Sequence, residues 1–468
     1  MSKKYKNLVL PGITIEKAAA EGKCVAKWDE QVVFVEGVAP GDVADIRIIR
    51  KKKNYLEAIP LDILEPSRLR TDPFCYHFGT CGGCKWQHIA YEHQLEFKRQ
   101  QVVDHLQRIA KIDFPEVSPT LPSPLTQYHR NKLEFTFSNY RWLEAQEITS
   151  GEEMDRRGLG FHKPRQFDKV VDLKTCYLQP EPSNAIRLWI KAYAVDKGLN
   201  FYDIRKKEGF LRNLVIRTAS SGELMVILQV GTYLKDELEA LLTSLQEAFP
   251  EITSLNYVVN NKGNETFYDL EVVNFAGKDH IIEHMEALQF RVGPKSFYQT
   301  NPQQALNMYR LVRDLARLKG QETIFDLYSG TGTIALFLAS QASEVVAIEQ
   351  VPEAVEDART NAKVNGIANA HFYAGDLKDV LKGGALDRHG HCDVLVTDPP
   401  RAGMHEEVIY EIAKLGPSRI VYVSCNPATQ ARDLALMDPW YRIESVHPLD
   451  MFPHTHHVES VVSLTKRN

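Results

Sequence analysis

The 468-residue sequence lacks several features that would assign it to a specialised class of protein. No apolar run approaches the roughly 18 residues that a membrane-spanning helix needs, and no apolar segment follows the basic start. Internal repeats and low-complexity tracts are missing as well. With 44% hydrophobic and 25% charged residues, the chain is typical of a globular protein with two to four domains. We therefore expect a protein without a membrane anchor or signal peptide, located in the cytoplasm.

Cysteine is scarce and unevenly distributed. The seven cysteines are odd in number, which argues against a disulfide framework in a chain without a secretory signal. Cys75, Cys81 and Cys84 stand together in a glycine-rich segment, and Cys176 follows 92 residues after Cys84. Four thiolates suit either Zn²⁺ or an iron–sulfur cluster, and the spacing alone does not separate the two. His77 and His88 are substitute ligands should Cys176 prove remote, whereas Cys24 and Cys392 lie in strand patterns and are interpreted as packing residues.

The sequence also lacks the basic balance of most dedicated nucleic-acid binders, because its net charge is −5. Residues 1–60 differ, with 11 lysines and arginines against 8 acidic residues. Phosphate contacts need only a local basic patch, although a solvated strand end has the same pattern. Two further segments, 128–132 (Tyr-His-Arg-Asn-Lys) and 86–88 (Trp-Gln-His), mix basic, polar and aromatic side chains. Both fit an RNA contact surface, and an ordinary mixed surface explains them nearly as well.

The hydrophobic pattern changes twice along the chain. Residues 8–62 alternate apolar and polar positions between glycines, which predicts a small antiparallel barrel with its exit linker at residues 64–67. After the cysteine segment, residues 91–111 have a helical pattern, and residues 129–275 mix strands with helices at 183–197 and 235–247. From about residue 285 strands and helices alternate, which predicts a parallel doubly wound sheet with an added C-terminal hairpin. The predicted domains are 1–66, 67–284 and 285–468, with helix 91–111 able to pack on the last.

A glycine-rich turn follows the first strand of the predicted sheet. Gly330-Thr331-Gly332 opens an apolar helix, and glycines at such a turn let a ligand approach the backbone and the helix N-terminus. Glu349 ends the next strand about 20 residues later, where a carboxylate can accept both hydroxyls of a ribose. Dinucleotide-binding enzymes share this pattern, so the turn by itself also fits NAD.

Two short motifs beyond the turn change that interpretation. Asp398-Pro399-Pro400-Arg401 and Ser424-Cys425-Asn426-Pro427 each follow a buried strand, and Glu459 lies in the last strand pattern, residues 458–464. A lone thiol at the carboxyl end of a strand lies where α/β proteins form their active sites. The order of glycine turn, Asp-Pro-Pro-Arg, Ser-Cys-Asn-Pro and late glutamate resembles the RNA (uracil-5-)-methyltransferases that use S-adenosylmethionine. An NAD enzyme leaves both motifs unexplained.

This resemblance implies a fold and an activity. The fold class is α/β: a class I (Rossmann-like) methyltransferase domain, an N-terminal OB-like barrel that resembles a TRAM domain, and a central α+β domain that carries the cysteines. The activity implied is methyl transfer from S-adenosylmethionine to C5 of uridine in RNA. Because C5 of uracil is a poor nucleophile, a thiolate adds to C6 to activate it, and a base later removes the C5 proton.

The resemblance also assigns roles to individual residues. Cys425 is the expected nucleophile and Glu459 the expected base, and Asn426 is expected to hydrogen-bond the uracil ring. The residues expected to contact S-adenosylmethionine are Gln299, Tyr328, Gly330, Gly332, Glu349, Asp376 and Asp398. Cys75, Cys81, Cys84 and Cys176 are expected to hold a 4Fe–4S cluster, with Zn²⁺ as the alternative occupant.

A TRAM-like barrel combined with a cysteine cluster resembles the 23S rRNA branch of this family, so the expected partner is 23S rRNA, without an obligate protein partner. The target uridine must be presented unstacked from the folded RNA. The alternatives are a methyltransferase acting on tRNA uridine or on another RNA base, and a non-catalytic iron–sulfur RNA-binding protein.

Overall fold

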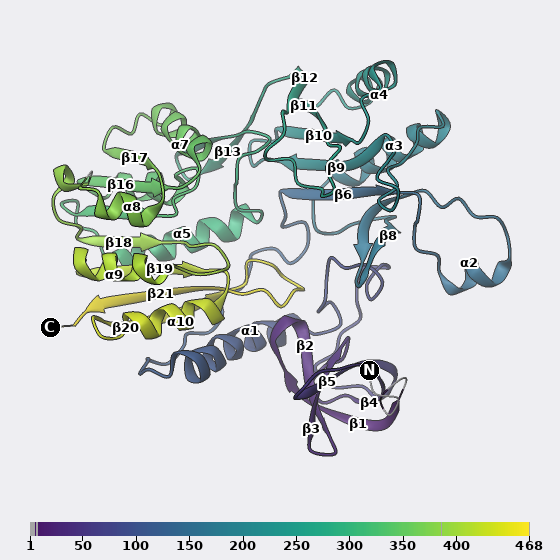
Figure 1. Cartoon of the computed structure of the whole chain (residues 1–468), viewed down its shortest axis with the longest axis horizontal. Coiled ribbons are helices and arrows are strands. Elements are labelled where there is room, and N and C mark those ends of the chain that lie inside the picture. Colours follow the sequence, from purple (N-terminus) through teal and green to yellow (C-terminus); the bar gives the residue numbers. More distant parts are fainter. Residues whose placement is uncertain (1–4, 6–7, 385, 468) are drawn as a thin grey trace.

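The computed structural model describes residues 5, 8–384 and 386–467, and its three parts are visible in Figure 1. A small barrel near the N-terminus lies below a central sheet, and the C-terminal sheet with its helices forms the other side of the molecule. Across these residues no helix combines the length and apolar character needed to cross a membrane. The α/β fold class predicted from the sequence is confirmed, while the exact domain limits stay a prediction.

The N-terminal part is a closed five-stranded barrel in the order β1-β2-β3-β5-β4. Its strands alternate buried and exposed residues, as β4 does with Ala44, Ile46 and Ile48 pointing inward, because successive side chains of a strand point to opposite faces. β5 continues to Glu65, so the exit linker begins at Pro66 and not at residue 64 as predicted. The strands are β1 (Val9–Ala18), β2 (Lys23–Trp28), β3 (Gln31–Glu36), β4 (Val43–Lys51) and β5 (Tyr55–Glu65).

An irregular segment that contains three cysteines leads from the barrel to helix α1 (Tyr91–His105), which a single π-helical turn, η3 (Leu106–Ala110), extends. The helix lies beside α10 between the barrel and the C-terminal strands (Figure 1). Its buried face repeats every four residues at Gln94, Lys98 and Val102. Lys98 is fully buried and forms an ion pair with the equally buried Asp450, which ties α1 to the C-terminal part.

The central part is a seven-stranded sheet in the order β12-β11-β10-β9-β6-β7-β8. Its core lies between this sheet and the apolar faces of α3 and α4, where Ile186, Ile190, Leu241 and Leu245 are buried. α2 lies on an excursion away from the body (Figure 1). The elements are β6 (Lys132–Ser138), α2 (Ala145–Ser150), β7 (Gly158–Lys163), β8 (Gln166–Asp172), α3 (Ser183–Asp196), β9 (Leu211–Thr218), β10 (Leu224–Val230), α4 (Lys235–Ala248), β11 (Ile252–Val259) and β12 (Val273–Gly277).

A two-stranded hairpin and a second seven-stranded sheet complete the chain, the sheet in the order β17-β16-β15-β18-β19-β21-β20. The first five strands in this order are parallel, and the hairpin β20–β21 is added antiparallel. The elements are β13 (Ile281–Met285), β14 (Leu288–Val292), α5 (Pro302–Ala316), β15 (Thr323–Leu327), α6 (Thr333–Ala339), β16 (Glu344–Glu349), α7 (Pro352–Val364), β17 (Ala370–Ala374), α8 (Leu377–Lys382), a 3-10 turn η4 (Asp387–His389), β18 (Val394–Thr397), α9 (Glu406–Leu415), β19 (Arg419–Ser424), α10 (Pro427–Met437), β20 (Tyr441–Leu449) and β21 (Glu459–Lys466).

Helices cover both faces of this second sheet. Val345 and Ala347 of β16 pack into one core with α5, α6 and α7, whereas Val346 and Ile348 pack into another with α1, α9 and α10. Because both faces of this parallel sheet are buried, its central strands are apolar at most positions. The predicted strands at 323–327, 344–348, 393–397 and 419–424 correspond to β15, β16, β18 and β19 within a residue at either end, whereas the short edge strand β17, which contains His371 and Tyr373, was not predicted.

Candidate functional site

The strand order reverses between β15 and β18, which are neighbours in the sheet although β16 and β17 lie between them in the sequence. Helices connected to these strands leave the sheet in opposite directions at such a point, so a crevice opens at the carboxyl ends of the strands. Asp326, Glu349, Asp398 and Cys425 lie at or next to the carboxyl ends of four parallel strands. The fold therefore gathers at one edge residues that the sequence separates by up to about 100 positions.

The glycine turn lies at the floor of this crevice. Gly330 and Gly332 both have positive φ, +54° and +76°, and Gly332 is the N-cap of α6. A Cβ on Gly332 would lie 2.9 Å from both Ala358 Cβ and Phe372 Cε1, so this position has no room for a side chain. A Cβ on Gly330 would meet nothing within 4 Å, which leaves open space above the turn. The turn thus combines exposed backbone with an unobstructed side, as a bound nucleoside requires.

Glu349 is fixed against this turn. One oxygen of its carboxylate accepts a hydrogen bond from the Gly330 backbone N–H (2.9 Å), and the other accepts one from Val351 N–H (3.0 Å). A carboxylate offers about four acceptor positions, so two remain for the hydroxyls of a ribose.

Tyr328 precedes the turn with a φ of +61°. Burial raises the pKa of Tyr328 to about 12, and the carboxylates of Asp433, Asp376 and Glu349 add to the shift, so Asp376 lies on the same side of the crevice. Asp376 is exposed and caps α8 by accepting a hydrogen bond from Lys378 N–H.

Two acids lie inside the crevice, Asp326 completely buried and Asp398 half-buried. Asp326 is completely buried, and neither oxygen of its carboxylate has a hydrogen-bond partner. Burial raises its pKa well above the ordinary value, with a further contribution from Asp398. Burial also raises the pKa of Asp398 to about 7. A buried carboxylate without a partner, as at Asp326, is unfavourable unless a cation joins it, so the crevice suits a positively charged ligand such as the sulfonium and ammonium groups of S-adenosylmethionine.

Gln299 lies in the segment that enters α5. Its backbone carbonyl accepts a hydrogen bond from the Asn131 side chain (3.2 Å). Its own side chain hydrogen-bonds to the buried hydroxyl of Tyr309. Asn301 caps α5 and also donates to the carbonyl of Met451 (3.0 Å). Burial raises the pKa of Tyr309, and Asp398 and Asp326 add to the shift, so the hydroxyl that Gln299 contacts lies near the acids of the crevice.

The predicted nucleophile and base lie opposite each other. In the antiparallel pair β19–β21, Ser424 pairs with Ser460, and this register places Cys425 across from Glu459. Residues opposite each other in antiparallel strands have Cα atoms roughly 4.5–5.5 Å apart. Cys425 is half-buried and Glu459 is 6% exposed. The two side chains therefore share one partly enclosed site beside Asp398.

The electrostatics of this pair follow from burial. The pKa of the Cys425 thiol is raised to about 11, mainly by burial and in part by the carboxyls of Glu459 and Asp398, with Arg401 opposing them. Burial likewise raises the pKa of Glu459 to about 8, with Asp398 adding to the shift and Arg401 opposing it. A neutral glutamic acid beside a thiol can exchange protons near physiological pH, as an acid–base group must.

Asn426 joins the two motif loops. Its side-chain oxygen accepts from Ala428 N–H, which caps α10, and its side-chain nitrogen donates to the carbonyl of Arg401 (2.9 Å). Thr429 also donates to that carbonyl. Asn426 thus holds the Asp-Pro-Pro-Arg loop with one donor and one acceptor position of its amide, and its expected hydrogen bond to the uracil ring stays a prediction.

The four cysteines of the predicted metal centre converge. Cys75, Cys81, Cys84 and Cys176 line one cavity together with apolar side chains that include Phe161 and Leu178. The pKa of Cys81 is raised to about 12, mainly by burial, with smaller contributions from the other three cysteines, which lie around it. Cys176 is therefore not remote, and His88 does not line the cavity. Cys24 and Cys392 are buried elsewhere, where each donates to a backbone carbonyl.

A direct connection runs from the cysteine segment to the segment before Glu459. The backbone N–H groups of Lys85 and Trp86, next to Cys84, both donate to the carbonyl of His454 (2.8 and 2.9 Å). The side chain of Gln94 on α1 accepts from His454 N–H (3.0 Å) and contacts its ring (3.2 Å). These four contacts hold His454 at its positive φ of 62°. We refer to residues 450–458 as the His454 turn.

Sequence reasoning missed this connection, although a signal existed. Gln94 and Lys98 follow the four-residue spacing of the apolar side of α1. The helical pattern therefore places two polar side chains at positions that should be buried. Buried polar groups must find partners, and both find them in the His454 turn.

The structure also corrects part of the predicted RNA contact surface. Trp86, Gln87 and His88 are buried, with exposures of 2%, 4% and 4%. Trp86 Nε1 donates to the carbonyl of Gly22, and the His88 ring contacts the carbonyl of Val38, so both pack the cysteine segment against the barrel. They cannot stack on bases. His129 is likewise buried, whereas Tyr128 is 42% exposed.

Three features together define the class of S-adenosylmethionine-dependent methyltransferases that act on RNA. They are a doubly wound sheet with an added antiparallel hairpin, an acidic crevice beyond a glycine turn, and an N-terminal barrel. The model of the tRNA (uracil-5-)-methyltransferase family matches residues 211–467, and that of the TRAM domain matches residues 12–61. The chain belongs to the tRNA (uracil-5-)-methyltransferase family and is an RNA methyltransferase that uses S-adenosylmethionine.

Whole-length relatives and a solved structure agree with this assignment. An uncharacterized RNA methyltransferase of Bacteroides thetaiotaomicron is 53% identical over 453 residues, which cover 96% of this chain and 100% of that protein. Another from Porphyromonas gingivalis is 52% identical and covers 97% and 99% of the two chains. The crystal structure of Pyrococcus abyssi tRNA (uracil-54, C5)-methyltransferase in complex with S-adenosyl-L-homocysteine has a TM-score of 0.76 and 30% identity, over 97% of this chain and 98% of that one.

Proposed function

We propose that this protein methylates C5 of a uridine in 23S rRNA through a covalent bond between Cys425 and C6 of the base. The observation that carries the proposal is the register of β19 and β21, because it sets Cys425 opposite Glu459 at the mouth of the crevice. The thiolate of Cys425 adds to C6, which gives C5 the electron density to accept a methyl group. Glu459 then removes the proton left on C5, and the thiolate leaves C6.

Several residues of the chain are suited to hold S-adenosylmethionine for these steps. S-adenosylmethionine, when bound, supplies an electrophilic methyl group and a positive charge that lowers the pKa of neighbouring acids. We assign Glu349 and the turn at Gly330 and Gly332 to the nucleoside part of this ligand. Asp326 and Asp398 suit its positive charge, with Gln299, Tyr328 and Asp376 around the crevice.

The rate should depend on pH with a defined sign. Burial raises the pKa of Glu459 to about 8 and that of Cys425 to about 11, and both groups act in their deprotonated forms. Below about pH 8 Glu459 keeps its proton, so kcat/KM should rise as pH increases through this value. Steady-state methylation assays with a single RNA across this range would measure the rise. A profile that falls over the same interval would contradict the assigned role of Glu459.

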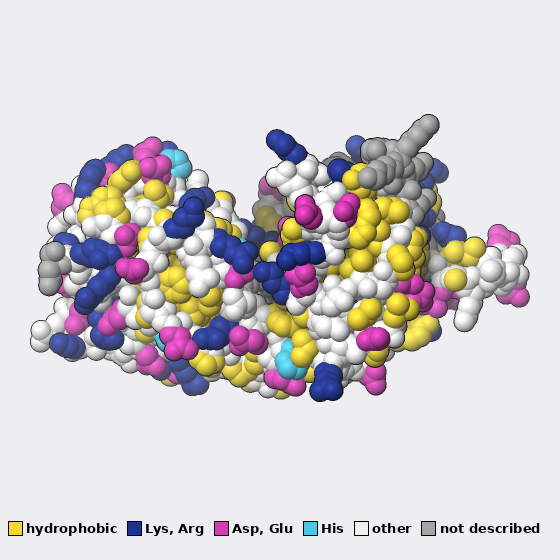
Figure 2. All heavy atoms as spheres, turned by 90° about the horizontal axis from the view of Figure 1, so that it is seen from below, with side chains coloured by type: hydrophobic (Ala, Val, Ile, Leu, Met, Phe, Trp, Pro, Cys, Tyr) yellow, Lys and Arg dark blue, Asp and Glu magenta, His cyan; other side chains and the backbone are white. Residues whose placement is uncertain are grey.

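The path of the RNA is supported by cations from three parts of the chain. Lys85 of the cysteine segment, Arg130 near β6 and Arg401 of the Asp-Pro-Pro-Arg loop all contribute to lowering the pKa of His457, whose main cause is burial. These three cations therefore lie near His457, which belongs to the His454 turn next to Glu459. Figure 2 shows a hollow between two lobes of the surface with Lys and Arg side chains gathered around it. Phosphate groups of an RNA strand would be attracted to such a group of cations.

The four cysteines are proposed to hold a 4Fe–4S cluster. Arg130 and Arg187 lie near enough to interact with Cys84 and Cys176, and cations there would offset the charge of an anionic cluster. All four cysteines line the same cavity, and Zn²⁺ is the alternative occupant of the same four thiolates.

We expect the Cys81→Ala variant to lose the cluster and to loosen the His454 turn, because Lys85 and Trp86 follow the cysteine segment directly. Iron analysis should show the loss, and hydrogen exchange should rise within residues 450–458. Methyl transfer should fall roughly 10- to 100-fold, as for loss of a supporting shell around an active site. Cys24→Ala, which removes a buried cysteine from the barrel core, should keep iron and exchange in this turn unchanged. Equal exchange in both variants would contradict the coupling.

A second candidate substrate is a tRNA uridine. The Pyrococcus abyssi enzyme is a tRNA methyltransferase and matches 97% of this chain, so barrel and central sheet occur together in a tRNA enzyme as well. Tritium release from RNA labelled at C5 of uridine separates the candidates when purified 23S rRNA and tRNA are compared. Release from rRNA alone supports the proposal, and release from tRNA alone replaces its substrate. Absence of release from either RNA would end the assignment to uridine C5.

A further inference from the structure

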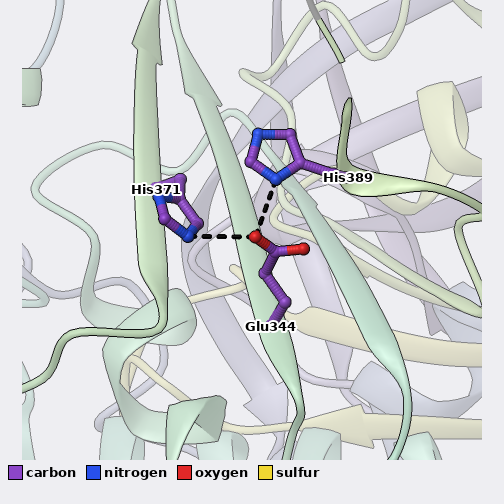
Figure 3. A group of neighbouring side chains, drawn as sticks. All are labelled: Glu344, His371 and His389. Carbon is purple, nitrogen blue, oxygen red and sulfur yellow. Dashed lines mark hydrogen bonds and ion pairs between the residues drawn. The ribbon is translucent and has the colours of Figure 1, made fainter. Parts of the chain in front are cut away.

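A second group of chemically active side chains lies outside the methyl-transfer site. Glu344, His371 and His389 come from the start of β16, from β17 and from η4. Nδ1 of His389 lies 2.8 Å, and Nε2 of His371 lies 3.0 Å, from the same oxygen of Glu344. Figure 3 shows the two rings approaching this carboxylate from different sides. All three potential ligand atoms lie within 4.8 Å of one another.

The group is half-open to solvent. The His389 side chain is 4% exposed, whereas those of Glu344 and His371 are 28% and 38% exposed. A buried ligand on one side and open positions on the other leave room for water or a further ligand on a bound ion. The carboxylate already holds both rings, so little ordering of side chains would be needed for binding.

The group lies at the edge of the sheet opposite to the crevice. Glu344 and Glu349 are the first and last residues of β16, and a strand rises about 3.3 Å per residue, so roughly 16 Å separate them. The two ends of one strand therefore carry two different sites. Nothing in the methyl-transfer step requires this second one.

We propose that Glu344, His371 and His389 form a binding site for a divalent transition-metal ion of the Zn²⁺ type. Two imidazole nitrogens and one carboxylate oxygen are ligands that Zn²⁺ binds, with further positions for water. Both rings now present N–H toward Glu344, so binding moves each ring proton to the other nitrogen.

A partner is in place for the proton of His389. Its Nε2 lies 2.6 Å from the hydroxyl of Tyr373, which can accept a hydrogen bond from the protonated nitrogen. Ligating histidines usually have such a second partner. Arg388 donates to the same hydroxyl and to Nε2 of the ring, so its hydrogen bond to Nε2 must break when that nitrogen takes the proton, and its exposed side chain can then be hydrated. The half-exposed His371 can place its proton toward water.

A bound ion would join three segments of the methyltransferase part. η4 lies in a connection that contains Gly383, Gly384 and Gly390, and β17 is the edge strand of the sheet. An ion shared by His389, His371 and Glu344 would join this connection and the edge strand to β16. The site would thus stabilise the methyltransferase part without taking part in the reaction.

Zn²⁺ titration of the full-length protein, with its cysteine centre loaded, tests the proposal. In competition with a chromophoric chelator, the wild type should bind one more equivalent of Zn²⁺ than His371→Ala, with iron content and visible absorbance unchanged in both. Zn²⁺ should raise the Tm of the wild type and leave that of His371→Ala unchanged. His284→Ala, which removes an exposed histidine from β13, should behave as the wild type.

Two further variants keep the result interpretable if His371→Ala unfolds. Glu344→Gln preserves size and hydrogen bonding but removes the charged ligand, and it should lose the same equivalent. Tyr373→Phe leaves all three ligands and should weaken Zn²⁺ binding about 10-fold or more. Equal Zn²⁺ binding by the wild type, His371→Ala and Glu344→Gln, or uptake accompanied by loss of iron in every protein, would overturn the proposal and leave a hydrogen-bonded cluster.

Discussion

Replacement of Cys425 by alanine should reduce methyl transfer to uridine by about four to six orders of magnitude, as loss of a catalytic nucleophile does in other enzymes. Without the sulfur there is no addition at C6, and C5 stays too poor a nucleophile to accept the methyl group. Cys425 is half-buried beside the crevice, so its loss leaves no large cavity. Formation of 5-methyluridine, counted per folded molecule, would measure the effect.

The control for this variant is Cys392→Ala. Cys392 is buried in the same part of the chain but lies at the other end of β18, away from the crevice. We expect it to lower stability and to keep the rate per folded molecule. Calorimetric titration with S-adenosyl-L-homocysteine should give similar affinities for both variants. Substantial methylation by Cys425→Ala would exclude a covalent route through this sulfur.

Replacement of Glu459 by glutamine should trap the reaction after the methyl group has been transferred. The amide fills the same space but cannot remove the C5 proton, so the thiolate of Cys425 cannot leave C6. We expect turnover to fall about 10²- to 10⁴-fold and a protein–RNA complex that survives denaturing electrophoresis to accumulate. Mass spectrometry of the digested complex should find a methylated uridine attached to Cys425.

The double variant Cys425→Ala with Glu459→Gln provides the reference, because it lacks the atom that forms the bond. No stable complex should appear with it. Should Glu459→Gln turn over at the wild-type rate, the base must be sought elsewhere, and Asp398 would be the nearest carboxyl on this side of the crevice.

Much of the methyltransferase site was predictable because its chemistry depends on residues in short motifs. Gly332 has no space for a Cβ, so the sequence has to carry glycine there. Asp398 and Cys425 follow apolar strands whose two-sided burial produces uninterrupted hydrophobic runs. The α/β fold, the barrel and the C-terminal hairpin could be predicted for the same reason, since each depends on a local periodicity.

Contacts between segments that lie far apart in the sequence were harder to predict from the sequence. The segment 86–88 was interpreted as RNA-contacting from its composition, yet Trp86 and His88 are buried against the barrel. The composition of a segment does not tell whether another part of the protein packs over it. The edge strand β17 was missed because its five residues, which include His371 and Tyr373, carry too weak an alternation to mark a strand.

By itself the sequence determined the order of the parts, the glycine turn with its acids, and a lone cysteine in a strand-end motif, because these depend on neighbours a few residues away. Tertiary structure alone decided that Cys425 faces Glu459, that Cys176 joins three cysteines far before it, and that Lys85 and Trp86 hold His454. Each of these contacts depends on strand register or on the packing of one part against another. Residues dozens to hundreds of positions apart meet there, and no local pattern in the chain records the distance between them.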